Sequence, residues 1–124
     1  MTFAAHFPAN CPPTEAQQAH GTVYRIVKSD PPAADDFSSH HETGKLPKVD
    51  ACMRCGLSVF RTRDDGIHQR NSYPRLGDYL ASGELHPTDG QTLLTTGKRP
   101  THTTWWPCEG TDRARPFVIL EKIS

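Results

Sequence analysis

The sequence predicts a small single domain of the α+β class, with a short, mostly antiparallel sheet, two or three short helices and a proline-rich N-terminal arm. A chain of 124 residues is long enough for one hydrophobic core but not for two. Strand-like and helix-like stretches follow one another in the irregular order β-α-β-α-β-β, whereas a parallel sheet needs regular alternation. The 11 prolines and 9 glycines predict that much of the chain is turn and loop.

Residues 1–20 are expected to form a loosely structured arm in front of a single α+β domain at residues 21–124. The arm contains Pro8, Pro12 and Pro13, which interrupt regular elements because proline has no backbone N–H. Its stretch "TEAQQAH" is long enough for only about two helical turns. The domain is therefore expected to fold without the arm.

The first strand is expected at residues 21–28, where successive side chains alternate between two faces in the stretch "GTVYRIVK". The segment after it predicts one short helix across residues 33–43. Asp30 is a suitable N-cap residue for this helix, and Gly44 is a suitable stop.

The second strand is expected at residues 57–62, "LSVFRT", on the same alternation argument. The region that follows predicts two helical pieces, which are separated at Pro74 and end at Gly83. The third strand is expected at residues 101–106, and the fourth at residues 115–123, the most apolar run of the chain.

The charge balance argues against nucleic acid as a partner. Lys and Arg together number 14, as do Asp and Glu, so the formal net charge is +0 and the isoelectric point is near 7.0. No apolar run has the length of a membrane-spanning helix, and the N-terminus lacks the pattern of a signal peptide. We expect a cytoplasmic protein, monomeric or dimeric, with no membrane association.

The motif Cys52-Met53-Arg54-Cys55 has the spacing with which two thiolates grip one zinc ion. Cys108 is the best candidate for a third ligand, because the turn at Pro107 can present it. A redox function fits poorly, because the two cysteines precede a strand instead of starting a helix after one. Ordinary cysteines in a loop remain an open alternative to the zinc site.

The stretch "TVYRIVKSDPPAADDF" resembles the opening of ADP-ribosyltransferases, in which a strand carries Tyr-Arg and a proline-bearing loop leads to an Asp-Phe pair. The matching residues are Tyr24-Arg25, Pro31-Pro32 and Asp36-Phe37. The resemblance covers about a third of the chain. It implies that Arg25 grips a nicotinamide dinucleotide (NAD).

The resemblance also implies two further site positions. The stretch "GLSVFRT" is similar in position to the serine-containing strand of the family and points to Ser58. The region "HTTWWPCEG" corresponds to the strand of the catalytic acid, for which it offers His102 or Glu109. The serine motif differs from the Ser-Thr-Ser form of the family, and no Glu-x-Glu pair follows it.

The two tryptophans, Trp105 and Trp106, are adjacent in an expected strand, so they should point to opposite faces. Trp106 and Thr104 lie at even separations from His102 and should share its face. We therefore expect Trp105 in the core and assign Tyr24, Thr104 and Trp106 as candidate binding residues.

The leading functional hypothesis is a small soluble binding or accessory module that recognises a protein partner, because the residues alone complete no catalytic set. The first alternative is an NAD-dependent, ADP-ribosyltransferase-like enzyme with Arg25, Ser58, His102 and Glu109 as catalytic candidates. The second is a structural domain stapled by zinc through Cys52, Cys55 and Cys108. The sequence leaves both the cofactor and the question of enzymatic activity open.

Overall fold

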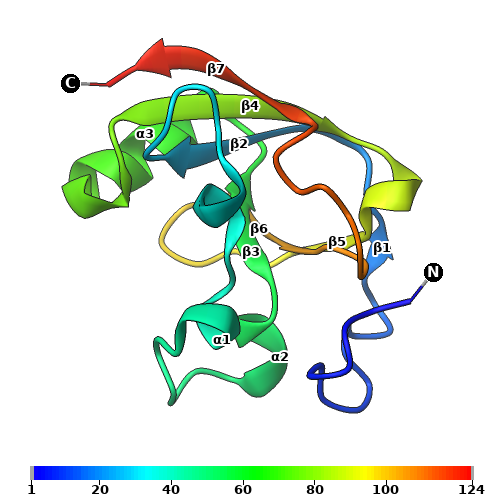
Figure 1. Cartoon of the computed structure of the whole chain (residues 1–124). Coiled ribbons are helices and arrows are strands. Elements are labelled where there is room, and N and C mark those ends of the chain that lie inside the picture. Colours follow the sequence, from blue (N-terminus) through cyan, green and yellow to red (C-terminus); the bar gives the residue numbers. More distant parts are fainter. Residues whose placement is uncertain (1, 124) are drawn as a thin grey trace.

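The computed structural model describes residues 2–123, and within them the chain forms one seven-stranded antiparallel sheet (Figure 1). The strand order is β1-β5-β6-β3-β2-β4-β7. The α+β class and the antiparallel sheet are confirmed. The strands are β1 (Gln17–Gln18), β2 (Gly21–Val27), β3 (Leu57–Phe60), β4 (Tyr79–Leu85), β5 (Gln91–Leu94), β6 (His102–Trp106) and β7 (Phe117–Lys122).

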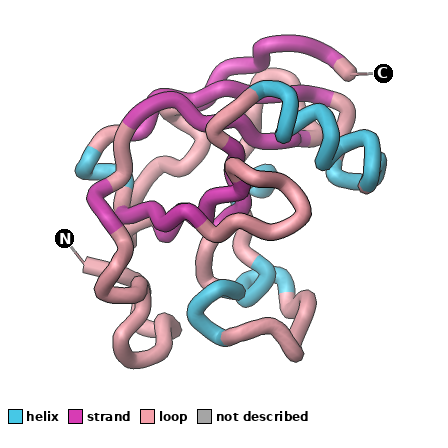
Figure 2. The backbone as a smooth tube through the Cα atoms, turned by 180° about the vertical axis from the view of Figure 1, so that it is seen from behind, coloured by secondary structure: helices cyan, strands magenta, loops and turns pink. Residues whose placement is uncertain are grey.

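The helices are short, and most of them lie in the connections. The longest is α3, which spans ten residues and begins where the Thr62 side chain accepts a hydrogen bond from the N–H of Asp65. Seen from behind, the short helices α1 and α2 lie in the loop-rich lower part of the molecule (Figure 2). The helical elements are η1 (Ala34–Phe37), α1 (His40–Thr43), α2 (Ala51–Arg54), α3 (Arg63–Ser72), η2 (Pro74–Leu76) and η3 (Pro87–Asp89).

The sheet divides into two halves between β2 and β3. These two strands are in register at Tyr24 and Phe60, and then diverge. In Figure 1, β2, β4 and β7 run together along the top, while β3, β5 and β6 lie below them. The main core fills the space between the halves, and its buried members come from both of them: Ala19, Val23, Val27, Phe37, Leu57, Val59, Ala81, Leu85, Trp105 and Phe117.

The predicted helix at residues 33–43 is two separate pieces, η1 and α1. The chain is extended at Ser38 and Ser39, which ends the first piece. Ser39 then caps the second piece, because its hydroxyl accepts from the N–H of Glu42 while the Glu42 carboxylate accepts from the N–H of Ser39. A local capping box therefore restarts the helix where the sequence predicted continuity.

The prediction of a second helical piece that ends at Gly83 was wrong, because most of that segment is the strand β4. This strand pairs along its whole length with β2 and also pairs with β7. A Cβ at Gly83 would lie 2.7 Å from the ring of Phe117, so glycine lets that ring pack onto the sheet. The strand β5, whose four residues pair with β6, was not predicted.

The N-terminal arm has more fixed contacts than its composition predicts. Cys11 forms a disulfide with Cys52, so the arm is covalently attached to α2. Its last residues form β1, which pairs with β5 at the edge of the sheet. Ala19 is fully buried in the main core. The arm is thus joined to the domain near its middle, through Cys11, and at its last residues.

Candidate functional site

The side chains of Ser58 and His102 meet on one face of the sheet. They come from β3 and β6, which are paired so that Phe60 lies opposite His102 and Ser58 lies opposite Thr104. The Ser58 Oγ atom lies 2.9 Å from the His102 Nε2 atom. Ser58 is exposed and His102 is half-buried, so a ligand can approach this pair from solvent.

The other ring nitrogen of His102 fixes its tautomer. Nδ1 lies 3.0 Å from the backbone carbonyl oxygen of Thr95 and 2.9 Å from the Thr95 hydroxyl. A carbonyl oxygen can only accept, so the proton of the neutral imidazole is assigned to Nδ1. Nε2 then accepts the hydrogen bond of the Ser58 hydroxyl. A hydroxyl bound to an oriented imidazole is the arrangement that activates a nucleophile or removes its proton.

Arg25 forms a hydrogen bond to the backbone of β3 at Ser58. Its Nε donates to the carbonyl of Asp36 at 3.0 Å, and Nη1 donates to the carbonyl of Ser58 at 2.7 Å. Its guanidinium carbon lies 5.6 Å from the centre of the Phe37 ring. Burial lowers the pKa of Arg25 to about 10, and Asp36 partly offsets that effect, so the group is a cation at neutral pH. The gap between the sheet halves is therefore bridged at Ser58.

A cavity of about 210 Å³ adjoins the imidazole of His102. It combines aromatic rings, cations and hydrogen-bonding groups. The Nζ atom of Lys98 donates to the Tyr73 hydroxyl at 3.0 Å, and this hydrogen bond raises the pKa of Lys98. The lining residues are Phe60, Gln69, Tyr73, Thr95, Gly97, Lys98, Arg99 and His102. A planar ring and an anionic group would both find partners here.

Thr104 and Trp106 lie on the His102 face of β6, as the alternation predicted. The Thr104 hydroxyl lies 2.8 Å from that of Thr95, which also contacts His102. Trp106, however, is fully buried, and its Nε1 donates to the carbonyl of Cys52 at 2.9 Å. The prediction that Trp106 is open to a ligand was therefore wrong, because α2 covers that end of the face.

Trp105 is the core residue that the sequence predicted. It is fully buried on the opposite face of β6, where its ring centre lies 5.9 Å from that of Phe117. Its Nε1 donates to the carbonyl of Asp89 at 2.9 Å, so its polar atom is also satisfied.

Glu109 and Tyr24, two other predicted site residues, lie outside the Ser58–His102 cluster. Glu109 is exposed in the turn after β6, and its backbone N–H donates to the carbonyl of Thr2 at 2.8 Å. Tyr24 lies under α3, where a Cβ added to Gly66 would be 3.7 Å from its Cβ. Of the two candidates for the catalytic acid, the structure brings His102 to Ser58.

The three cysteines predicted to hold zinc are not gathered into one site. Cys52 is joined to Cys11, so its thiol is not free to bind a metal. Cys55 is buried, and burial raises the pKa of its thiol. The thiol of Cys108 donates to the carbonyl of Thr88 at 3.0 Å. Across residues 2–123, no three His, Cys, Asp or Glu side chains are grouped to hold a metal ion.

The loop between β5 and β6, which contributes Thr95, Lys98 and Arg99 to the cavity, was not predicted as part of the site. A signal was present, because the stretch "TTGKRPTH" places two cations and a glycine directly before the strand of His102. Tyr73 could not be found in the same way, since it approaches from the end of α3.

Comparison with protein-family models, with curated proteins and with solved structures finds no match to this chain. In the part of the chain that the structure describes, no helix has the length and apolar character needed to cross a membrane.

Proposed function

We propose that the chain binds a nicotinamide dinucleotide beside His102 and acts on it as an ADP-ribosyltransferase-like enzyme. One observation carries this proposal. Arg25, Ser58 and His102 come from three strands that are distant in sequence. Arg25 donates to the backbone carbonyl of Ser58, and the side chain of Ser58 contacts His102. The resemblance to ADP-ribosyltransferases implies a role for Arg25, for Ser58 and for either His102 or Glu109. The enzyme proposal is thus supported by three separate sequence motifs that lie close together in the structure.

The cavity next to His102 supports the same function. Its volume of about 210 Å³ is below the range typical of sites for whole drug-sized ligands, so it would hold one part of a dinucleotide. Phe60 and Tyr73 offer aromatic surfaces to a ring. Lys98 and Arg99 offer cations to a phosphate group.

The chemistry that this arrangement can support is transfer from the ribose carbon that carries nicotinamide. With water as the acceptor, a bond forms between the water oxygen and that carbon, and the carbon–nitrogen bond to nicotinamide breaks. Nicotinamide leaves as a neutral molecule with the bonding electron pair. Nε2 of His102 takes the proton of the water, directly or through the Ser58 hydroxyl. A protein or small-molecule hydroxyl could replace water as the acceptor.

Proton NMR of the reaction mixture tests the proposal, because free nicotinamide and the intact dinucleotide give separate signals. The full chain should release nicotinamide, and His102→Gln should reduce the rate by about 100-fold or more, as loss of a general base does. His86→Gln is the matched control, since His86 is exposed outside the cluster and should release nicotinamide at the unchanged rate.

Thermal unfolding with millimolar dinucleotide separates binding from turnover. Binding at 100 times the dissociation constant adds about 2.7 kcal/mol to the free energy of unfolding. The protein and His102→Gln should both be stabilised, because the imidazole acts in the chemical step. If neither stabilisation nor nicotinamide release is observed, the enzyme proposal fails, and the protein-binding module becomes the better hypothesis.

A further inference from the structure

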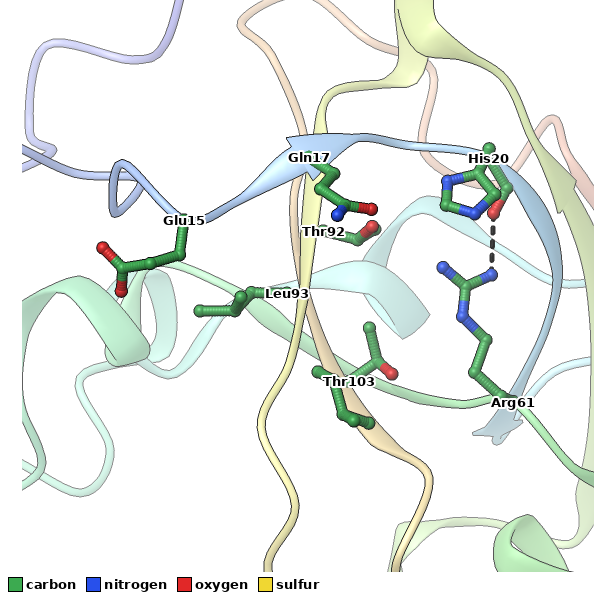
Figure 3. A pocket seen from close by; sticks show the side chains of 8 residues that line it. Glu15, Gln17, His20, Arg61, Thr92, Leu93 and Thr103 are labelled. Atoms are coloured by element: carbon green, nitrogen blue, oxygen red, sulfur yellow. Dashed lines mark hydrogen bonds between the residues drawn. The ribbon is translucent and has the colours of Figure 1, made fainter.

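A second cavity lies away from His102, on the other face of β6. It measures about 350 Å³ and is lined by Thr103, whose neighbour His102 lines the first cavity. Figure 3 shows that its walls come from β1, β5 and the ends of β3 and β6. The side chains of Arg61, Gln17 and Thr92 are among those that face it.

Arg61 is held in this cavity by one end of its guanidinium group. Its Nη1 donates to the carbonyl of His20, in the turn between β1 and β2, at 2.7 Å, and to the carbonyl of Thr22, in β2, at 3.3 Å. Its Nε and Nη2 atoms make no hydrogen bond to residues 2–123, and Nη2 is turned toward the side of Gln17 and Thr92 in Figure 3. Nη1 of Arg61 thus has a structural role, whereas Nε and Nη2 can donate hydrogen bonds to a ligand.

The positive charge of Arg61 has no carboxylate in contact with it. Within the described residues, no Asp or Glu oxygen lies within ion-pair distance of its guanidinium. Glu84 acts on it from farther away, and its carboxylate accepts from the Thr22 hydroxyl. Glu15 lines the cavity, but its carboxylate accepts from Thr14 and is directed away from Arg61 in Figure 3.

Burial disfavours the charged form of the Arg61 guanidinium. Desolvation lowers the pKa of Arg61, with Glu84 opposing the effect. A half-buried cation without an ionic partner gains most from an anion that can accept two parallel hydrogen bonds. The amide of Gln17 and the hydroxyl of Thr92 can supply further donors.

We infer that this cavity is a binding site for a small ligand that carries an oxyanion group, a carboxylate or a phosphate, with Arg61 as its charged contact. The inference does not depend on the proposed enzymatic function. The two sites have separate lining residues and lie on opposite faces of the same strand.

Titration of ¹⁵N-labelled protein with inorganic phosphate, and separately with acetate, tests the inference. Saturable shifts should be confined to amides around Gln17, Arg61 and Thr92, and the stronger of the two titrations identifies the preferred oxyanion. Arg61→Gln should weaken binding by about tenfold or more, since it removes the charge. Arg75→Gln removes an exposed cation elsewhere and should leave the affinity unchanged.

Gln17→Ala keeps the test decisive if Arg61→Gln fails to fold, because the Gln17 side chain is exposed and makes no hydrogen bond to residues 2–123. This variant should lower the affinity for the preferred oxyanion by about threefold. Shifts spread evenly over the surface cations, or equal affinity in Arg61→Gln and the unchanged protein, would overturn the inference. The absence of saturable shifts with either anion would also overturn it.

Discussion

The two adjacent tryptophans are buried to the same extent but by different means. Trp105 lies in the main core, where strands from both halves of the sheet surround it. Trp106 lies on the other face, under a region formed by Ala51–Gly56, which we call the α2 region. The main core depends on strand packing, whereas the α2 region depends on a helix of four residues and a disulfide. Equal burial therefore does not mean equal dependence on covalent and local support.

Trp105→Ala should have the largest effect on stability. Removing a fully buried aromatic side chain from a core costs about 3–5 kcal/mol in the free energy of unfolding. Urea denaturation followed by circular dichroism measures it. A loss below about 1 kcal/mol would show that the main core can collapse around the missing ring.

Replacing Cys11 with Ser should affect Trp106 and leave Trp105 unchanged. The disulfide closes a loop of 41 residues in sequence separation, and the loss of such a bridge costs about 2–4 kcal/mol. Iodide should then quench the fluorescence of Trp106 but not that of Trp105. Variants that keep only one of the two tryptophans separate the two signals. Protection of both rings in Cys11→Ser would mean that the α2 region does not need its bridge.

Gly56→Ala should destabilise the α2 region by about 1–3 kcal/mol. A Cβ at this position would clash with Cγ2 of Thr104 and would lie 3.2 Å from Nε1 of Trp106. Gly97→Ala is the matched control, because a Cβ there meets nothing within 4 Å. Its free energy of unfolding should change by less than about 1 kcal/mol. Similar losses in both variants would contradict close packing at Gly56.

Acid should weaken the α1 segment before the rest of the fold. Burial alone would raise the pKa of Glu42, but hydrogen bonds from Arg113 and Ser39 outweigh it and lower this pKa to about 2. The resulting stabilisation is therefore complete above about pH 4.5 and is lost as the pH falls toward 2. Because the carboxylate is partly exposed, we expect about 1 kcal/mol from this group.

The measurement for this prediction is the free energy of unfolding between pH 5 and pH 2, compared with that of Glu42→Gln. The variant should lose the Glu42 contribution at the upper end of this range and show a shallower decrease with acid. The same slope in both proteins would show that Glu42 is not responsible.

The strands with clear alternation could be predicted from the sequence, as β2, β3 and β6 show. Burial of Trp105 followed from the same alternation. The burial of Trp106 could not be predicted, because it depends on α2, a four-residue helix beside a disulfide between residues 41 positions apart. β4 was missed because its glycine and alanine have low strand preference, and the packing of Phe117 on Gly83 decides its conformation.

In the candidate site too, residues on strands could be predicted from the sequence, whereas residues placed by tertiary packing could not. Arg25, Ser58 and His102 could be named from short motifs, since each lies on or beside a predictable strand. Thr95, which orients His102, and Tyr73, which lines the cavity, come from a loop and a helix end whose positions depend on tertiary packing. The disulfide of Cys52, which removes it from the predicted zinc site, could not be foreseen because nothing local pairs Cys11 with Cys52.

Mapping the binding of the nicotinamide dinucleotide on ¹⁵N-labelled protein tests the central claim most directly. Ligand should shift the ring nitrogens of His102 and the backbone amides of Ser58, Thr95 and Lys98. The indole signal of Trp105, on the opposite face of β6, should stay in place. Shifts that are absent at millimolar ligand, or that are confined to residues away from His102, would contradict the assignment of this face as the functional site.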